Sequence, residues 1–235
     1  MLYHSFLIKY SEIGTKGKNR YVFEDALVHD IRRKLKRAEG SFRVTRERGR
    51  IYVSSKSEDY DPESLIEALR HVFGIIGICP MVQFENDGNI ESLKREVLSY
   101  WGELYRGKEK SFKVYTRRAD KSFPLSSPEI DAELGHEILD AFPESSVDVH
   151  NPEVRLHVEI RQFINLYSEI IPGPGGMPLG TNGKAMLLLS GGIDSPAAGY
   201  MIAKRGALIE ACYFHAPPYT SERAKQKVVD LAKKL

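Results

Sequence analysis

Apolar residues over the first 84 positions alternate between strand-like and helix-like spacing. Residues 20–37 repeat apolar side chains every three or four positions, which predicts an amphipathic helix. Asp61-Pro62 predicts the start of a second helix that ends before Gly74. The expected elements are strand His4–Tyr10, helix Arg20–Arg37, strands Phe42–Thr45 and Ile51–Ser54, the helix after Asp61, and strand Cys79–Phe84. This β-α-β-β-α-β order predicts a ferredoxin-like domain.

A second small α/β unit follows. We expect a helix from Asn89 through Tyr100, strand Ser111–Arg117, helix Ile130–Ala141, and strands Val154–Arg161 and Phe163–Ile170, which form a candidate hairpin. Residues 171–180 hold proline and glycine too densely for a helix or strand, which predicts a linker. The predicted domains are therefore residues 1–76, 77–171 and 172–235.

The last part of the chain has the pattern of an α/β nucleotide domain. We expect strand Ala185–Leu189, helix Ala197–Arg205 ending at Gly206, strand Leu208–Phe214 and helix Glu222–Lys234. Strand, helix and strand in this order predict parallel strands with a right-handed crossover. A doubly wound sheet normally has about five or six strands. Only two precede Leu235, so we interpret this unit as the start of a truncated doubly wound parallel sheet in an α/β fold, after two α+β domains.

The most informative loop joins the first strand and helix of this unit, and it reads Ser190-Gly191-Gly192-Ile193-Asp194-Ser195. Two glycines let the backbone approach an anion and tolerate positive φ, and amides at a helix N-terminus suit phosphate. Ser195 is the expected N-cap and Pro196 the first helical residue. The spacing fits neither the Walker loop nor the dinucleotide-binding loop. It resembles the S-G-G-x-D-S signature of the PP-loop ATP pyrophosphatases.

Composition and charge narrow the function class. The chain has 235 residues, of which 42% are hydrophobic, so it can bury more than one core. Cys79 and Cys212 lie far apart in apolar surroundings, which predicts a reduced protein without a disulfide. No membrane span or signal peptide is evident, so we expect a cytoplasmic protein with no membrane contact. Residues 1–56 hold 14 Lys and Arg against 6 Asp and Glu, a net charge of +8. A basic first domain suggests a polyanionic partner.

Three blocks together resemble the bacterial tRNA 4-thiouridine synthetases, the tRNA uridine sulfurtransferase (ThiI) family. The first is Tyr10–Arg20, similar to a Y-x-E-x-x-x-K-G-x-N-R opening. The second is Val147–Val154, similar to a V-D-V-x-x-P segment, and the third is Ser190–Pro196 followed by Phe214–Ser221. The resemblance covers nearly the whole chain. It implies an N-terminal ferredoxin-like domain, a THUMP domain that binds RNA, and a PP-loop domain.

The resemblance also implies a reaction and its partners. ATP and Mg²⁺ would adenylate O4 of a tRNA uridine with release of pyrophosphate, and persulfide sulfur from a cysteine desulfurase-type protein would then displace AMP. Sulfur transfer to the thiamine thiazole and a homodimer are implied as well. The catalytic cysteine of the family is expected beyond Leu235, so neither Cys79 nor Cys212 is assigned a sulfur-carrying role.

Within the last unit, Asp194 is the expected catalytic residue, and its carboxylate is the candidate ligand for Mg²⁺. Capping of helix amides by the same carboxylate is the alternative. Strand ends in such sheets hold the nucleotide base, so main-chain groups there are candidates to read adenine while the leucine side chains pack in the core. The expected ATP-binding residues are Leu188, Leu189, Ser190, Gly191, Gly192, Ile193, Asp194, Ser195, Tyr213 and Phe214. His215 has a ligand-binding and a structural interpretation.

The expected RNA-binding residues fall in two loops. Lys16, Lys18 and Arg20 lie beside glycines in the first domain, where a solvated turn is the alternative. The second group is Arg117, Arg118, Lys121 and Phe123, whose guanidinium and ring faces suit unpaired nucleotides at a tRNA 3′ end. The basic segment 32–37 is a further RNA candidate, although cations at a helix C-terminus also offset the macrodipole.

Two other functions stay open at this point. The chain is either an RNA-binding module without catalysis, or a PP-loop ligase that adenylates a small molecule, as relatives of GMP synthetase and asparagine synthetase do. The basic first domain argues against the small-molecule ligase. A salt-dependent gel shift with tRNA and no pyrophosphate release would identify the binding module.

Overall fold

The computed structural model describes residues 3–10, 12–47, 49–57 and 59–234. Chain contacts divide them into two compact units, drawn from 1–7, 52–58 and 79–171, and from 8–51, 59–78 and 172–235. No helix in the described ranges is long and apolar enough to cross a membrane.

The first domain has the predicted ferredoxin-like order, which is confirmed. Its elements are β1 (Ser5–Lys9), α1 (Arg20–Leu35), β2 (Phe42–Glu47), β3 (Arg50–Ser55), α2 (Pro62–Arg70) and β4 (Gly77–Glu85). Two short 3₁₀ turns, Glu12–Thr15 and Gly17–Asn19, precede α1. The strands lie in the order β2-β3-β1-β4. Asp61 caps α2 by accepting hydrogen bonds from the amides of Glu63 and Ser64, as Asp before proline predicts.

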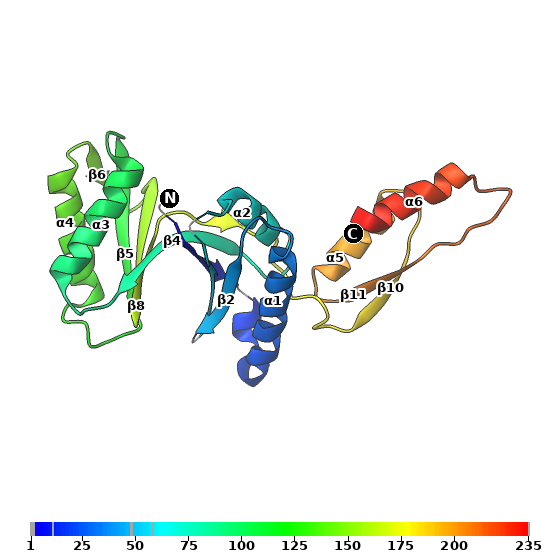
Figure 1. Cartoon of the computed structure of the whole chain (residues 1–235), viewed down its shortest axis with the longest axis horizontal. Coiled ribbons are helices and arrows are strands. Elements are labelled where there is room, and N and C mark those ends of the chain that lie inside the picture. The colour runs from blue at the N-terminus through cyan, green and yellow to red at the C-terminus, as the bar shows by residue number, and fades with distance from the viewer. Residues whose placement is uncertain (1–2, 11, 48, 58, 235) are drawn as a thin grey trace. The chain divides into compact units, whose positions relative to one another are not determined.

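The second α/β domain contains α3 (Ile90–Tyr105), β5 (Lys110–Arg118), α4 (Ser127–Ala141), β6 (Ser145–Val147), β7 (Val154–Ile160) and β8 (Phe163–Tyr167). The predicted hairpin is confirmed, because β7 and β8 pair antiparallel, whereas β5 and β7 pair parallel. Helices α3 and α4 cover one face of these strands (Figure 1). Trp101, Phe112 and Leu134 are fully buried between the helices and the sheet.

Two features differ from the sequence predictions. Strand β8 pairs with β4, so the described strands of both domains form one sheet with the order β2-β3-β1-β4-β8-β7-β5-β6. The segment 171–180 is not free of strand structure, because β9 (Ile171–Pro172) pairs with β4. Backbone hydrogen bonds also hold later residues of this segment in place. For example, the Gly74 amide donates to the Gly175 carbonyl at 2.8 Å.

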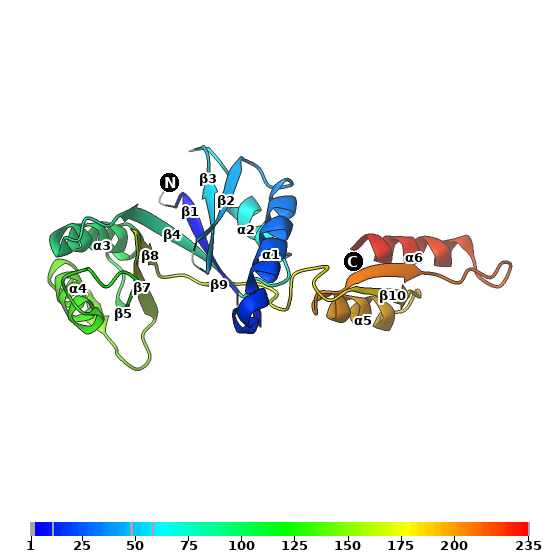
Figure 2. The same cartoon turned by 90° about the horizontal axis from the view of Figure 1, so that it is seen from below.

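The third part consists of β10 (Lys184–Leu188), α5 (Asp194–Ala203), β11 (Leu208–Cys212) and α6 (Glu222–Lys234). Strands β10 and β11 pair parallel, with Leu188 opposite Cys212, which confirms the predicted parallel pairing. The two strands run between α5 and α6 in Figure 2. Several large apolar side chains of this part are exposed, among them Met186 at 60% and Leu188 at 62%. The expectation that Leu188 packs in a core does not hold in this structure, because among the described strands β10 pairs only with β11.

Candidate nucleotide-binding loop and RNA-binding residues

The candidate nucleotide loop lies between the carboxyl end of β10 and the first turn of α5. The amide of Leu189 extends the strand pairing by donating to the Cys212 carbonyl at 2.8 Å, and the Leu189 side chain is buried. The chain then leaves the sheet at Ser190. The loop is therefore anchored at its start by the sheet and at its end by the helix.

Two serines close this loop. The Ser190 amide donates to Ser195 Oγ at 2.9 Å, and the two hydroxyl oxygens lie 3.0 Å apart. The Gly192 amide approaches Ser190 Oγ at 3.4 Å. Helix α5 begins at Asp194 with Ile193 as its N-cap, so the prediction of Ser195 as N-cap and Pro196 as first helical residue is wrong. Ser195 is the second residue of α5, and its hydroxyl bonds to Ser190 within the loop instead of capping the helix.

Most amides of this loop have no hydrogen-bond partner among the described residues. Among the interactions of the described residues, none uses the amide of Gly191, Ile193, Asp194 or Ser195. The first amides of any helix have no intrahelical acceptor, and their dipoles favour an anion. Among the described residues, the first hydrogen bond of this helix runs from the Ala197 amide to the Ile193 carbonyl at 3.3 Å. Four free donors thus occupy consecutive or neighbouring positions at one helix N-terminus.

The two loop glycines do not have positive φ, contrary to the sequence expectation. A Cβ on Gly191 would meet the Lys227 Cδ at 3.8 Å, and a Cβ on Gly192 would meet Ser190 Oγ at 3.6 Å, both ordinary contact distances. The chain's own packing therefore does not demand glycine at either position. Lys227, on α6, was missed by sequence reasoning because a helical lysine gives no signal that it lies beside a loop 36 positions earlier.

The Asp194 carboxylate is exposed at the first position of α5. Within the described ranges no group donates a hydrogen bond to it, so the alternative role of capping helix amides has no support. No cluster of three or more His, Cys, Asp or Glu side chains suited to a metal occurs among the described residues. A single free carboxylate suits a cation that takes its remaining ligands from phosphate oxygens and water.

The residues after β11 lie outside the strand, because β11 ends at Cys212 rather than at Phe214. Phe214 is 74% exposed and does not pack in a core. Tyr213 is partly buried, with its ring 6.0 Å from that of His215. His215 Nδ1 pairs with Thr220 Oγ1 at 3.1 Å, and Nε2 lies 3.6 Å from Glu222. These contacts favour the structural interpretation of His215.

Arg20, in the first basic loop, is committed to partners in its own domain. Its guanidinium donates to Glu24 Oε1 at 2.7 Å and to the Tyr10 hydroxyl at 2.7 Å. The single proton of the Tyr10 hydroxyl is shared between two acceptors, the Glu24 carboxylate and the Gly49 carbonyl. Burial, followed by the hydrogen bond to Glu24, raises the pKa of Tyr10. A Cβ at Gly49 would overlap the Arg20 guanidinium. Arg20 therefore organises this network and is a poor candidate for direct RNA contact.

Lys16 and Lys18 remain accessible in that loop. Both side chains are exposed, and Lys16 Nζ lies 4.9 Å from the centre of the Phe23 ring. An ammonium group bound over an aromatic ring can still attract an anion on the side that faces away from the ring.

The residues of the second basic loop differ in exposure, in part because successive side chains of a strand point to opposite faces. Arg118 shares its face of β5 with the buried Phe112 and Val114, and its guanidinium donates to the carbonyls of Phe123, at 2.8 Å, and Leu125. Its buried Nε has no partner among the described groups. Phe123 is only 3% exposed and belongs to the core. The expected stacking of Phe123 on a nucleotide does not fit this burial, whereas Arg117 and Lys121 are exposed.

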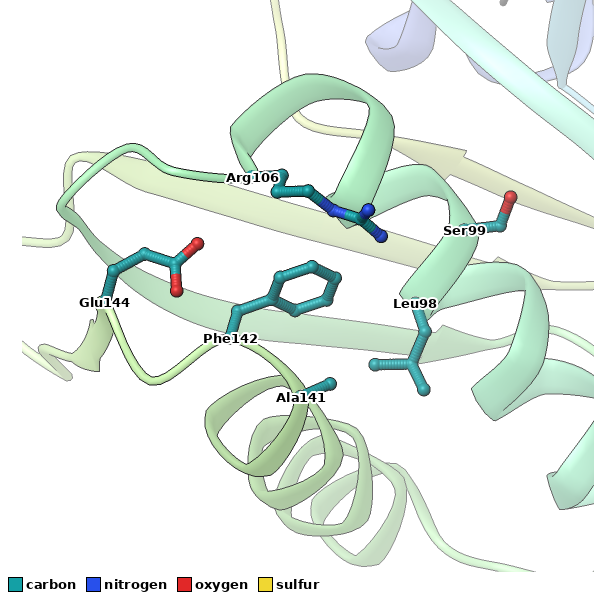
Figure 3. Close-up of a pocket in the computed structure, with 6 residues that line it drawn as sticks. All are labelled: Leu98, Ser99, Arg106, Ala141, Phe142 and Glu144. Atoms are coloured by element: carbon teal, nitrogen blue, oxygen red, sulfur yellow. The ribbon is translucent and has the colours of Figure 1, made fainter.

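A hollow of about 450 Å³ in the second domain is shown in Figure 3, between the ends of α3 and α4. Arg106 lies over the Phe142 ring at 5.8 Å, and Glu144 accepts a hydrogen bond from the Gly107 amide at 2.7 Å. That hydrogen bond is the main reason why the pKa of Glu144 is lowered. The charged groups of this hollow, Arg106 and Glu144, are thus engaged within the domain. None of the predicted site residues lines the hollow.

Comparison with known proteins gives consistent matches along the chain. Residues 5–79 match the ThiI ferredoxin-like domain, residues 88–168 match the THUMP domain, and residues 180–235 match the family described as thiamine biosynthesis protein (ThiI). A probable tRNA sulfurtransferase of Lachnospira eligens is 63% identical over 99% of the chain and 59% of its own length. One from Agathobacter rectalis is 59% identical over 100% of the chain and 59% of its own length. The chain thus spans about three fifths of these relatives.

Two solved structures are similar. A 4-thiouridine synthetase in complex with RNA and bound ATP is 38% identical, with a TM-score of 0.80 over 97% of this chain and 57% of that one. PH1313 from Pyrococcus horikoshii is 28% identical, with a TM-score of 0.80 over 98% of this chain and 74% of that one.

Proposed function

The chain belongs to the ThiI family of tRNA sulfurtransferases, and on this premise we propose that it supplies the ATP-binding loop and the tRNA-binding domains of an enzyme that converts a tRNA uridine to 4-thiouridine. In the proposed reaction, O4 of the uridine attacks the α-phosphorus of ATP and pyrophosphate leaves. The outer sulfur of the persulfide then attacks C4, and AMP leaves with the former O4. A second thiol attacks the inner sulfur of the disulfide so formed, which releases 4-thiouridine and leaves a disulfide between the two thiols.

The observation that carries this proposal is that one loop contains both free amides and two glycines, and that the packing of the chain does not require glycine at either position. The amides of Gly191, Ile193, Asp194 and Ser195 have no partner among the described residues. Glycine at 191 and 192 is not explained by φ or by internal packing. A phosphate group in contact with the backbone explains both, because it accepts the hydrogen bonds and needs the space that a side chain would fill.

Asp194 fits a Mg²⁺ ion bound jointly with ATP, since its carboxylate is exposed and beside these amides. Such an ion neutralises negative charge on the departing pyrophosphate. Lys227, whose Cδ lies next to Gly191, adds positive charge at the same edge of the loop. Main-chain groups of Leu188, Leu189, Tyr213 and Phe214 lie at the carboxyl ends of the two strands, where such sheets hold the base.

For the RNA, we assign direct contacts to the exposed cations of the two loops, Lys16 and Lys18 in the first domain and Arg117 and Lys121 in the second. Arg20 and Arg118 act as positioning residues, since their guanidinium groups hold neighbouring backbone in place. Phe123 supports its loop from the core.

The remaining parts of the proposal rest on family membership. They are a persulfide donor of the cysteine desulfurase type, a homodimer, a second use of the carried sulfur in thiamine thiazole synthesis, and a cytoplasmic location, where tRNA is found.

The test is pyrophosphate release by the full-length protein that carries this sequence, with ATP, Mg²⁺ and tRNA. Asp194→Asn should lower the rate at least about 100-fold, as expected for loss of transition-state charge stabilisation, while tRNA affinity stays unchanged. Asp230→Asn is the matched control. Asp230 is an exposed carboxylate in the same part of the chain, and it accepts a hydrogen bond from the Gln226 side chain. Equal rates for the two variants would remove Asp194 from the mechanism.

The open alternatives are separated by the same assay. Salt-dependent tRNA binding without pyrophosphate release at any protein concentration would identify an RNA-binding module. Pyrophosphate release that needs no RNA would identify a small-molecule ligase.

A further inference from the structure

A hollow of about 470 Å³ within the second compact unit is lined by basic side chains from distant parts of the sequence. Arg33, Lys34 and Arg37 come from the C-terminal end of α1, and Lys234 comes from the C-terminal end of α6. The rings of Phe73 and Tyr200 meet edge to face in the same hollow, 5.1 Å apart. None of these groups has a role in the nucleotide loop.

Asp30 balances the charge of Arg33, but Lys34, Arg37 and Lys234 have no paired carboxylate among the described residues. No carboxylate is among the described residues that line the hollow. The nearby Asp30 is buried and already engaged, because it pairs with Arg33 at 2.8 Å and accepts the Leu179 amide at 3.2 Å. Burial, followed by the charges of Arg37 and Arg33, lowers the pKa of Lys34. Crowded cations that destabilise one another favour the binding of an anion.

A simpler explanation covers only part of this arrangement. Cations in the last turn of a helix are favourable because they offset the negative end of the macrodipole, and both α1 and α6 have them. This effect accounts for basic residues at each helix end separately. It does not account for two such ends, 200 positions apart, facing one hollow together with two aromatic rings.

We propose that this hollow binds the phosphodiester backbone of RNA, which, given the proposed function, is the tRNA substrate. Compact phosphate groups are usually held by helix N-termini and amide nests. The helix ends here are C-termini, which repel an anion, so only the long side chains provide attraction. Arg33, Arg37 and Lys234 are exposed and Lys34 is half-buried, so the positive charge is distributed along an open surface. Such a distribution suits successive phosphates of a strand.

The test compares two double variants of the chain in binding to labelled tRNA over a range of salt concentrations. Lys34→Gln with Arg37→Gln removes two lining cations. Lys36→Gln with Lys233→Gln removes two cations from the same helix ends that do not line the hollow. The first pair should reduce the slope of log K against log salt by about 1.5, at roughly 0.7–0.9 per lost phosphate contact, and the control should change it by less than half as much.

A second readout does not depend on variants. Bound tRNA should protect Lys34 from acylation, measured by mass spectrometry, while Lys36 stays reactive. Equal slopes for the two variants, or equal labelling of Lys34 with and without tRNA, would overturn the assignment. So would loss of inorganic pyrophosphate binding in the first variant with tRNA affinity retained, which would mark a small-anion site. If the unaltered chain binds no tRNA at all, it is the proposed function that fails.

Discussion

Ser190 and Ser195 lie at opposite ends of the glycine loop, and the amide of Ser190 donates to the hydroxyl of Ser195 at 2.9 Å. Their hydroxyl oxygens are a further 3.0 Å apart. This pair closes the loop before any ligand is bound, and the amides of Gly191, Ile193 and Asp194 between the two serines have no partner among the described residues. Preorganisation of this kind lowers the entropy cost of holding a phosphate.

Ser195→Ala should therefore weaken ATP binding about fivefold, since a typical hydrogen bond contributes about 1 kcal/mol and the loop would lose its closure. Isothermal titration calorimetry with ATP measures the effect. Ser195→Thr keeps the hydroxyl oxygen and is the matched control. If Ser195→Ala binds ATP as tightly as Ser195→Thr does, the serine pair does not shape the site.

Glycine should matter for different reasons at two positions of this part of the chain. Gly192→Ala should leave the melting temperature almost unchanged, because its Cβ meets Ser190 Oγ only at 3.6 Å, yet it should reduce ATP affinity. Gly206→Ala should lower stability by about 2 kcal/mol, since φ is +90° and the Cβ would approach the Pro178 carbonyl oxygen to 2.9 Å. Thermal unfolding and ATP titration of both variants distinguish the two costs. A Gly192→Ala variant with normal ATP affinity would contradict the backbone contact.

Lys227→Met should weaken ATP binding several-fold and affect AMP less, because the Lys227 side chain passes beside Gly191 and its positive charge attracts the more highly charged triphosphate more strongly. Lys225→Met, two positions away on α6 and paired with Glu222, is the control. Competition with a fluorescent ATP analogue measures both. An equal effect of the two substitutions would indicate a general effect of charge.

Arg117 and Arg118 should separate in experiment although they are neighbours. Arg117→Ala with Lys121→Ala should reduce the salt slope of tRNA binding by about 1.5 without a change in unfolding temperature. Arg118→Ala should lower the unfolding temperature, because two carbonyl groups, of Phe123 and Leu125, lose a charged donor. Filter binding and thermal unfolding provide the two readouts. The division is incorrect if Arg118→Ala alters only the salt slope.

The sequence was sufficient to predict the order of most helices and strands, because their apolar periods are regular and Pro62 and Gly206 mark helix ends. It did not reveal β6, which has three residues and depends on pairing with β5. Nor did it reveal that β4 joins two domains in one sheet, because strand partners are chosen by contacts distant in sequence.

For the site, the loop 190–195 was identified because its chemistry is local. The partners that engage Arg20 and Arg118 were not predicted, because a cation in a loop looks the same in sequence whether it faces solvent or organises the backbone. For Arg118 a signal was present: it has the same parity along β5 as Phe112 and Val114, which are buried. For Arg20 one local signal was present, Glu24 four positions later on α1, whereas its contact with Gly49 joins positions 29 apart.

The central claim is that the main chain from 191 to 195 holds the phosphate tail of ATP. The most direct measurement is an amide NMR titration of the chain with ATP, with adenosine and pyrophosphate as separate controls. The account predicts that the amide signals of Gly191, Ile193, Asp194 and Ser195 shift with ATP and with pyrophosphate but not with adenosine. If these four signals stay in place while ATP binds and shifts other residues, the claim is contradicted.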